Sequence, residues 1–464
     1  MHRATHAGPV DLLALHRLAP ADYPFLLQSV AGHPLSGRYD ILFAFPQAHF
    51  IFRDGNLSSS TDVPVVGQDF FSSLTEWCAK EGTKAAGDVL PFTGGWFLFL
   101  GYEMARQVEP QVRMPDSPFR FPDALAVRCP AAAIFDRERQ ETHLIAERDP
   151  AQLQRLEQDL NRIKKTAPIT PALSPHTTWG EGEFHRTLVS EVQEEPPEKF
   201  TSGVSRILEY LRAGDVFQVN LSRAWSAKLA PGAAFADLYE RLRISNPAPF
   251  AGFASWDNSA VLSSSPERLV EIRGRQVQTR PIAGTRPRGV NAAEDQKLRE
   301  QLVASLKERA EHIMLIDLER NDLGRVCEAG SVSVSELMTV ESYEHVHHIV
   351  SNVRGRLRPD TGPGEVLRAV FPGGTITGCP KVRAMEIIAE LEGVGRGPYT
   401  GAMGYLSLDG RLDMNILIRS LVVEDGRVSL RAGAGIVSDS RPELELAETR
   451  AKARGLLNAF GMPA

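Results

Sequence analysis

Long hydrophobic runs and clustered cysteines are both missing from this sequence. Its four cysteines lie far apart and form no CxxC pair, which argues against a disulfide framework and a cysteine-rich zinc site: Cys78, Cys129, Cys327 and Cys379. No segment approaches the roughly 20 apolar residues of a membrane-spanning helix. The first residues also lack the apolar core of a signal peptide. We therefore expect a cytoplasmic protein that does not act at a membrane.

The sequence also has no excess of positive charge. It carries 52 basic and 58 acidic residues, a formal net charge of −6, and no long basic block. These numbers give no electrostatic reason to expect nucleic acid as a partner. Hydrophobic residues make up 42% of the 464 residues, which excludes disorder for most of the chain and is enough to build a large enzyme.

One segment is typical of a linker. Residues 166–183 read TAPITPALSPHTTWGEGE, with three prolines and little periodic hydrophobicity. This segment divides the chain into an N-terminal part, residues 1–165, and a longer C-terminal part, residues 184–464.

Both parts show a mixture of strand and helix patterns. Leu269–Ile272 and Gln276–Thr279 flank a short turn, and Tyr405–Leu408 and Leu412–Val423 meet across an Asp-Gly turn. Strands joined by two-residue turns are antiparallel. A long helix is predicted over Ala293–Met314 from its helical spacing of apolar residues. The expected fold class is α+β with large antiparallel sheets.

Two segments near the C-terminus carry charges in informative positions. Glu445, Glu448 and Lys452 are three and four residues apart, so they share one face of a predicted helix over 442–460. This spacing suits a surface ion pair, but the preceding RAGAGIV could bring the N–H groups of its glycines, including Gly435, near an anion. Arg419 lies in NILIRSLVV, predicted as a strand buried on both faces. Its anionic partner is either a structural carboxylate or a carboxylated substrate.

Other polar segments are weak signals on their own. PGGTITGCPK, residues 372–381, is a glycine-rich loop that enters a helix without the P-loop Lys-Ser/Thr pattern. His345 and His347 share a strand face, but no third ligand at a telling spacing accompanies them, so a histidine metal site is not favoured. A site made of carboxylates without thiolates points instead to Mg²⁺.

A set of segments, taken in order, resembles the chorismate-utilising enzyme family. Between Gly203 and Phe460 they are GDVFQVNLSR, SSSPERLV, RPIAGTRPRG, AEHIMLIDLERNDLGRV, VHHIVSNV, FPGGTITGCPKVRAMEII, YTGAMGYL, DMNILIRSL and AGAGIVSDSRPELELAETRAKA. YPFLLQSV, SGRYDILFAFP and FTGGWFLFLGYE resemble the N-terminal region of anthranilate synthase and aminodeoxychorismate synthase large subunits. The resemblance implies one α+β body, with a sandwich of antiparallel sheets that takes strands from both parts and has helices packed outside.

The resemblance also implies a binding site for chorismate. It places Mg²⁺ between Glu311 and Glu448, with Glu445 beside them, where the ion holds the ring carboxylate. The residues that match those holding the enolpyruvyl carboxylate are Tyr399, Arg419, Gly435 and Lys452, and those that match the ring lining are Thr285 and Thr375.

The same resemblance assigns the acid–base chemistry. Glu267 is similar to the general acid that protonates the departing 4-hydroxyl, and His348 to the histidine beside that leaving group. Gln218 stands where isochorismate and salicylate synthases carry a lysine that activates water. Because ammonia needs no such base, an amine-adding enzyme is favoured.

Within the family, the resemblance favours component I of aminodeoxychorismate synthase. Ala283, in PIAGT, stands where that enzyme commonly has a catalytic lysine, and anthranilate synthases share the alanine. The other positions resemble aminodeoxychorismate synthase: Asn220, residues 247–250, Glu319, Thr377 and Asn415. The expected reaction is Mg²⁺-dependent amination of chorismate at C4 to 4-amino-4-deoxychorismate, for 4-aminobenzoate and folate synthesis. Because the lysine is missing, a non-covalent 2-amino-2-deoxyisochorismate intermediate is expected.

Two alternatives remain open. One is anthranilate synthase component I, which aminates C2 and eliminates pyruvate for tryptophan synthesis, and the other is a non-catalytic homologue that binds a partner. Neither Cys327 nor Cys379 resembles a glutaminase nucleophile, so ammonia is expected from a separate glutamine amidotransferase subunit. In related anthranilate synthases, LLES and NPSPYM build a tryptophan feedback site, whereas this chain has LLQS and NPAPF. Gln28 in place of the glutamate argues against feedback inhibition.

Overall fold

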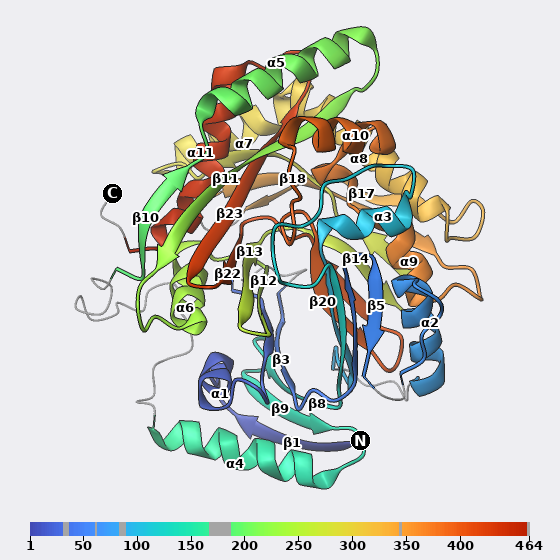
Figure 1. Ribbon diagram of the computed structural model, residues 1–464, viewed down its shortest axis with the longest axis vertical. Coiled ribbons are helices and arrows are strands. Elements are labelled where there is room, and N and C mark those ends of the chain that lie inside the picture. Colours follow the sequence, from blue (N-terminus) through green and yellow to red (C-terminus); the bar gives the residue numbers. More distant parts are fainter. Residues whose placement is uncertain (31–36, 61–62, 83–89, 167–186, 343–345, 462–464) are drawn as a thin grey trace.

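The computed structural model describes residues 1–30, 37–60, 63–82, 90–166, 187–342 and 346–461. These residues form two large antiparallel sheets with helices on their outer faces (Figure 1). The predicted α+β class with large antiparallel sheets is confirmed. Among the described residues, no helix is both long and apolar enough to cross a membrane.

The first sheet has 12 strands. In spatial order they are β1 (His2–Ala7), β9 (Glu141–Ala146), β8 (Ala131–Asp136), β3 (Tyr39–Ala44), β2 (Phe25–Gln28), β12 (Phe250–Trp256), β13 (Ser259–Ser265), β22 (Ser420–Glu424), β23 (Arg427–Ile436), β11 (Gln218–Leu229) and β10 (Val189–Glu194), with β19 (Gly378–Cys379) beside β11.

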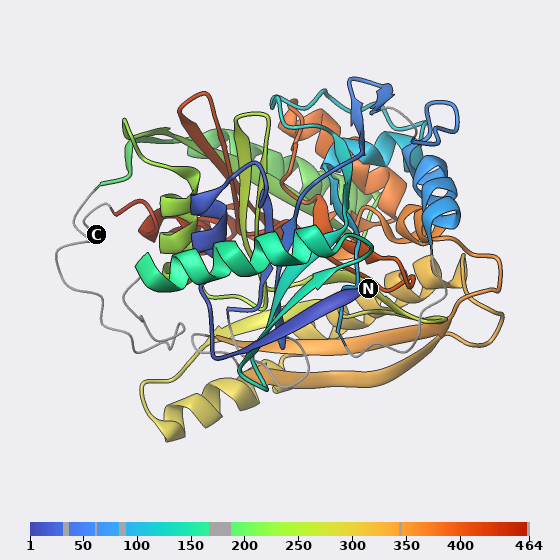
Figure 2. The ribbon, with the colours of Figure 1, turned by 90° about the horizontal axis from the view of Figure 1, so that it is seen from below.

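The second sheet has 11 strands. Their order is β16 (Ile282–Pro287), β18 (Val346–Arg356), β15 (Gln276–Thr279), β14 (Arg268–Arg273), β21 (Leu412–Asn415), β20 (Ala402–Ser407), β6 (Gly95–Leu100), β7 (Ala124–Cys129), β4 (His49–Arg53) and β5 (Asn56–Ser59), with β17 (Ser333–Ser342) beside β18. Figure 2 shows the long strands β17 and β18, in orange, along one side of the molecule.

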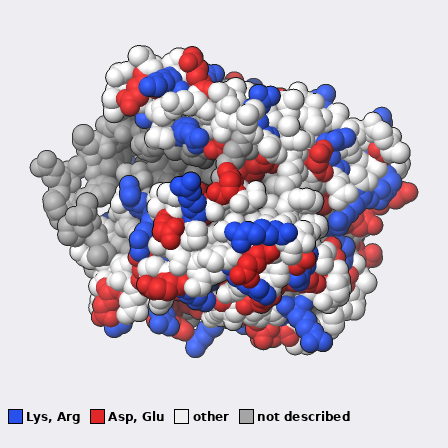
Figure 3. Space-filling view, turned by 90° about the horizontal axis from the view of Figure 1, so that it is seen from above, with Lys and Arg blue, Asp and Glu red and all other residues white. Residues whose placement is uncertain are grey.

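The helices cover the sheets from outside. They are α1 (Leu12–Leu18), α2 (Phe70–Glu81), α3 (Ala105–Val108), α4 (Pro150–Thr166), α5 (Pro197–Ala213), α6 (Phe235–Ser245), α7 (Ala292–Ala304), α8 (Leu306–Gly324), α9 (Pro363–Val370), α10 (Lys381–Glu392) and α11 (Pro442–Asn458). Acidic and basic side chains are interspersed on the face seen from above (Figure 3), in keeping with their near balance in the sequence.

Aromatic side chains join the two sheets at the centre of the molecule. Phe25 on β2 and Phe97 on β6 are fully buried, and their rings stack with centroids 4.0 Å apart. Each sheet also takes strands from both predicted parts of the chain, since β2 pairs with β12 and β6 pairs with β20. The predicted linker, residues 166–183, lies outside the described residues except for Thr166, which ends α4. The division at this linker stays a prediction.

The predicted strand over Leu412–Val423 is wrong. The chain leaves the second sheet after β21, crosses through residues 416–419, and enters the first sheet as β22. Arg419 ends this crossing in the left-handed region, with φ 54°. The crossing segment is apolar because it passes between two sheets, and its N–H groups bond outside a regular ladder, as when Ile416 donates to the carbonyl of Glu267 at 3.0 Å. Apolar periodicity reports burial and cannot distinguish these two situations.

The predicted long helix over Ala293–Met314 is also wrong. The structure divides it into α7 and α8 at Ser305, whose hydroxyl accepts the N–H of Glu308 at 3.3 Å as an N-cap. Both helices pack against β16 and β18, so the apolar spacing continues across the break.

A buried ion-pair network joins α10 to the first sheet. Glu392, 3% exposed, accepts hydrogen bonds from Arg396 at 2.7 Å, Arg431 at 2.8 Å and the Ser222 hydroxyl at 2.8 Å. Burial acts to raise the pKa of Glu392, but the two arginines hold it below its usual value. The carboxylate therefore satisfies two buried cations at once.

Glu392→Gln is expected to lower the free energy of unfolding by about 3–5 kcal/mol, because it leaves buried guanidinium charge uncompensated. Equilibrium urea unfolding at neutral pH measures this loss. Glu386→Gln, on the same helix with a side chain 41% exposed, is the matched control and should change stability by no more than about 1 kcal/mol. Equal stability of the two variants would contradict the assignment.

Candidate functional site

The predicted site residues come from separate elements of both sheets. Glu267 lies in the turn between β13 and β14, and Arg419 ends the crossing between β21 and β22. The remaining positions are Glu311 on α8, Glu445, Glu448 and Lys452 on α11, Gly435 on β23, Ala283 and Thr285 on β16, His348 on β18, Thr375 in the short helical turn Gly374–Ile376, and Tyr399 before β20.

Glu267 is a buried carboxyl with an elevated proton affinity. Its side chain is 5% exposed, and Oε1 has no hydrogen-bond partner among the described residues. Burial raises the pKa of Glu267 to about 7, against the opposing effects of the Thr375 hydroxyl, the Ile282 N–H and Lys452. A carboxyl that is about half protonated near neutral pH can donate a proton to a leaving group.

Arg419 is a half-buried cation without a carboxylate at ion-pair distance among the described residues. Burial lowers its pKa, while Tyr399 and Glu448 nearby oppose that change. The sequence left open whether a structural carboxylate pairs with this arginine. No described carboxylate does so, and an enclosed guanidinium of this kind suits an anionic ligand.

Lys452 places a second cation in the same region. Its Nζ donates to the carbonyl of Gly433 at 3.0 Å and pairs with Glu448 at 2.7 Å. A Cβ at Gly433 would come within 2.8 Å of the Tyr399 hydroxyl, so the missing side chain lets that hydroxyl approach the strand. Arg419, Tyr399, Glu448 and Lys452 are thus neighbours, and the binding roles that the resemblance assigns to them stay predictions.

Glu311 lies beside the glycine-rich end of β23. Its Oε1 accepts a hydrogen bond from Gln218 Nε2 at 2.8 Å, and a Cβ at Gly435 would come within 2.3 Å of that nitrogen and 3.5 Å of that oxygen. A side chain at 435 would therefore displace the Gln218 amide from its bond to Glu311. Gln218 is 3% exposed and supplies no basic amine to this region.

The predicted Mg²⁺ ligands fit a hard cation by their chemistry, because all of them are carboxylates. Glu311 comes from one helix, and Glu445, which is buried, and Glu448 come from another. Among the residues that the structure describes, no three His, Cys, Asp or Glu side chains converge closely enough to form a ready metal site. The Mg²⁺ assignment therefore stays a prediction.

His348 is an uncharged imidazole at neutral pH. Burial, followed by the nearby charge of Arg419, lowers its pKa to about 4, and its Nδ1 lies 3.5 Å from the carbonyl of Gly284. Thr285 pairs with His348 in the sheet, but its side chain lies outside the described residues. Ala283 is buried and follows Ile282, the residue whose N–H stabilises the carboxylate of Glu267.

Of the two histidines weighed as a possible zinc pair, His347 alone lies among the described residues. His345 lies outside the described residues. His347 is 1% exposed and bonds to Asp295 at 2.9 Å and to the Ser342 hydroxyl at 2.7 Å. These contacts are those of a buried structural histidine.

Sequence reasoning missed one ionisable group near the site. Glu319 on α8 is 5% exposed, and burial, followed by the charge of Asp322, raises its pKa to about 8. In the sequence, Glu319 stood out only as one of the positions that resemble aminodeoxychorismate synthase. Nothing in DLERND distinguishes an inward-facing glutamate from one on a helix surface.

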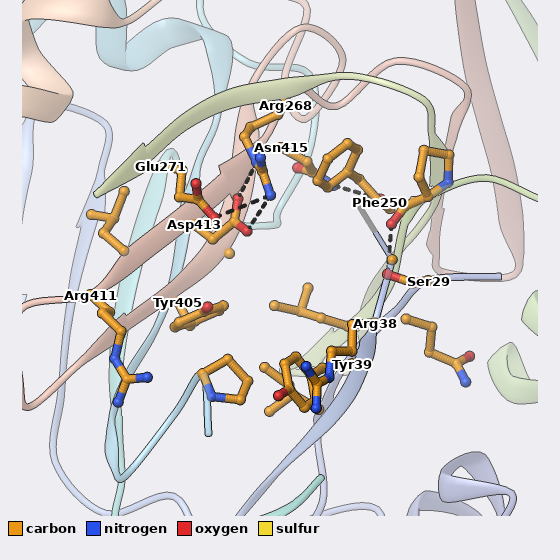
Figure 4. Close-up of a pocket in the computed structure, with 18 of the residues that line it drawn as sticks. Ser29, Arg38, Tyr39, Phe250, Arg268, Glu271, Tyr405, Arg411, Asp413 and Asn415 are labelled. Atoms are coloured by element: carbon orange, nitrogen blue, oxygen red, sulfur yellow. Dashed lines mark hydrogen bonds and ion pairs between the residues drawn. The ribbon is translucent and has the colours of Figure 1, made fainter. Parts of the chain in front are cut away.

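A cavity of about 500 Å³ lies apart from these residues, between strands of the two sheets. Figure 4 shows Ser29 beside Phe250, and Arg268 paired with Asp413 across the cavity wall. The Ser29 hydroxyl donates to the carbonyl of Pro249 at 2.9 Å, and the Asn415 amide donates to the carbonyl of Phe250 at 3.0 Å. LLQS and NPAPF therefore meet here, and this cavity contains none of the predicted chorismate-site residues.

Comparisons with known proteins give a consistent result. The sequence pattern of the chorismate binding enzyme family matches residues 35–458. Anthranilate synthase component 1 from Thermus thermophilus is 43% identical, covering 97% of this chain and 94% of that protein. An anthranilate synthase component I-like protein from Synechocystis is 41% identical, covering 92% of this chain and 84% of that protein. The crystal structure of anthranilate synthase component I from Streptococcus pneumoniae matches with a TM-score of 0.77 at 33% identity, covering 92% and 93% of the two chains.

Proposed function

The chain belongs to the chorismate binding enzyme family, and from this premise we propose that it aminates chorismate with ammonia to give 4-amino-4-deoxychorismate. The observation that carries the amination is Glu267, a buried carboxyl with a pKa of about 7 that lies close to Lys452. The C4 product is supported by the positions that resemble aminodeoxychorismate synthase.

Chorismate carries two carboxylates, and a separate group of positive charges binds each of them. Arg419, Lys452 and the Tyr399 hydroxyl bind and orient the enolpyruvyl carboxylate. A Mg²⁺ ion held by Glu311, Glu445 and Glu448 would supply positive charge for the ring carboxylate. Glu267 then donates its proton to the 4-hydroxyl, which leaves as water while ammonia adds to the ring. His348, neutral at this pH, offers a polar but uncharged neighbour to that leaving group.

The choice of ammonia over water as nucleophile follows from position 218. Gln218 donates its amide to Glu311 and has no basic nitrogen that could activate water. Ammonia needs no such activation, because its nitrogen lone pair is a stronger nucleophile than the oxygen lone pairs of neutral water.

Ammonia is proposed to come from a glutamine amidotransferase subunit. All four cysteines lie among the described residues, and burial raises the pKa of each thiol, to about 11 at Cys78 and Cys327 and about 12 at Cys129. A glutaminase nucleophile needs a thiolate, which such thiols do not supply at neutral pH.

Ala283 decides the proposed route to C4. With no lysine amine at this position, ammonia adds at C2 as the 4-hydroxyl leaves, which gives 2-amino-2-deoxyisochorismate. A second ammonia then attacks C4, and the C2 nitrogen, protonated as an ammonium group, leaves as neutral ammonia. Detection of a covalent enzyme adduct without any free 2-amino compound would overturn this route.

Anthranilate synthase component I is the second candidate. The names of the relatives reported above favour it, and so does Ala283, which anthranilate synthases share. The two candidates share the first amination and differ in the next step, which is either a second amination at C4 or elimination of pyruvate.

Product analysis with the purified chain separates the candidates. Chorismate, Mg²⁺ and excess ammonium are expected to give a product that an added aminodeoxychorismate lyase converts to 4-aminobenzoate, as detected by mass-resolved chromatography. Anthranilate with stoichiometric pyruvate would establish the second candidate.

Glu448→Ala is expected to abolish consumption of chorismate, and unchanged consumption by this variant would contradict the metal assignment.

A further inference from the structure

A second buried carboxyl lies behind Glu267. Glu319 faces inward from α8 and, like Glu267, is only 5% exposed. The charge of Glu267 acts on Glu319, so the two carboxyls are close enough to influence each other. When one buried carboxyl is ionised, its negative charge makes ionisation of a second carboxyl nearby less favourable.

Two further charged groups act on Glu319 besides Glu267. Asp322 lies one turn further along α8, and Lys381 begins α10. Lys381 Nζ donates to Asp322 Oδ2 at 2.5 Å, and the side chains of this pair are 7% and 0% exposed. The charge of Lys381 acts to lower the pKa of Glu319, but burial and the negative charges of Asp322 and Glu267 outweigh it and raise that pKa to about 8.

Each carboxyl also has a hydroxyl beside it. Thr279, at the end of β15, lies next to Glu319, and Thr375 lies next to Glu267. Thr279 Oγ1, Thr375 Oγ1 and Glu267 Oε1 are all buried, and none has a hydrogen bond of good geometry to another described residue. Buried polar atoms without partners are rare in folded proteins, and here they border both carboxyls.

Resting on the proposed role of Glu267 as general acid, we propose that Glu319 is a proton store that returns a proton to Glu267 after each leaving-group step. Glu267 gives its proton to the 4-hydroxyl, the C4–O bond breaks and water departs. The proton of the Glu319 carboxyl then moves to the Glu267 carboxylate through the neighbouring hydroxyls. The ammonium group formed on the substrate releases the proton that recharges Glu319, so each cycle balances. Glu319 does not touch the substrate itself and acts only by returning a proton to Glu267, so it is a positioning residue.

The first test counts protons and needs no activity. A carboxyl that keeps its proton in the folded chain loses it on unfolding near pH 7, so the unfolding free energy falls as pH rises between the unfolded and folded pKa values. Equilibrium urea unfolding of the full chain at a series of pH values from about 6 to 7.5 gives this slope. Glu319→Gln is expected to reduce the slope by about one proton, because glutamine keeps the shape and has no proton to lose.

Asp317→Asn is the matched control for this measurement. Asp317 lies on the same helix with its side chain 61% exposed and is expected to leave the slope unchanged. An unchanged slope in Glu319→Gln would show that Glu319 is ionised at neutral pH, and would overturn the proposal.

The second test follows turnover. Glu319→Gln is expected to lower kcat about tenfold and to raise the solvent deuterium isotope effect on kcat, while KM for chorismate changes less than about twofold. Glu319→Asp should recover part of kcat, since it restores a carboxyl. A kcat and isotope effect equal to those of the unsubstituted chain would overturn the proton-store role. If the unsubstituted chain consumes no chorismate, the proposed function fails, whereas the proton count still decides the state of Glu319.

Discussion

Glu267→Gln is expected to lower kcat for ammonia-dependent chorismate consumption by about 100- to 10,000-fold. Glutamine keeps the size and one carbonyl oxygen of the side chain, but it cannot donate an acidic proton to the departing 4-hydroxyl. The binding groups around Arg419 and Lys452 stay in place, so the dissociation constant of chorismate should change little. Stopped-time product analysis and equilibrium binding measure the two quantities separately.

The pH dependence of the unsubstituted chain provides the companion result. The active form of Glu267 is the protonated one, and its pKa is raised to about 7. Activity at constant free ammonia is therefore expected to be full below pH 7 and to decline as pH rises through about 7. Glu267→Gln should lack this decline in its residual rate. A rate that rises through pH 7 would assign Glu267 the role of a base and contradict the proposed mechanism.

Arg419→Met is expected to weaken chorismate binding by about 100-fold or more. Removal of one partner of an enclosed charge pair costs about 2–5 kcal/mol of binding free energy. Methionine keeps an unbranched apolar side chain, although a shorter one, and removes the charge and the N–H donors of the guanidinium group. It faces the same left-handed backbone strain at φ 54° as arginine does. Equilibrium binding of chorismate, measured by the quenching of intrinsic fluorescence, gives the change.

The stability of the same variant distinguishes a substrate role from a structural one. Without substrate, the Arg419 guanidinium has no ion-pair carboxylate among the described residues, so the methionine variant should unfold at the same or a higher urea concentration. A loss of stability together with unchanged chorismate binding would identify Arg419 as a structural residue. Arg427→Met, at an exposed turn of the same sheet, is the control and should alter neither quantity.

The choice between the two amination products rests on fewer independent observations than the sequence suggests. Asn415 donates its amide to Phe250 within the cavity wall. Asn220 and Thr377 are also neighbours, since the Asn220 N–H donates to the Thr377 carbonyl at 2.8 Å. These positions therefore fall into a pair at 415 and 250, a pair at 220 and 377, and Glu319, and so are not five separate indications. Identification of the product therefore decides between aminodeoxychorismate and anthranilate more directly than single sequence positions do.

Local patterns in the chain sufficed for the fold class, the family and some of the helix and strand positions. The turn between Leu269–Ile272 and Gln276–Thr279 forms the hairpin of β14 and β15, and the predicted C-terminal helix is α11. Helical spacing alone placed Glu448 and Lys452 within ion-pair distance, at 2.7 Å. These features depend on residues close in sequence, whose relative positions follow from backbone geometry.

Only the folded chain decided how distant segments meet, because apolar periodicity records that a residue is buried and not what surrounds it. The same pattern around Arg419 suits a strand or a crossing between sheets, and the structure has the crossing. Glu319 looks like a surface residue of α8, yet packing turns it toward Glu267, where the loss of water around both carboxyls raises their pKa values. Desolvation depends on every neighbouring element at once, so these proton affinities arise from the tertiary structure and cannot be derived from any one segment of the sequence.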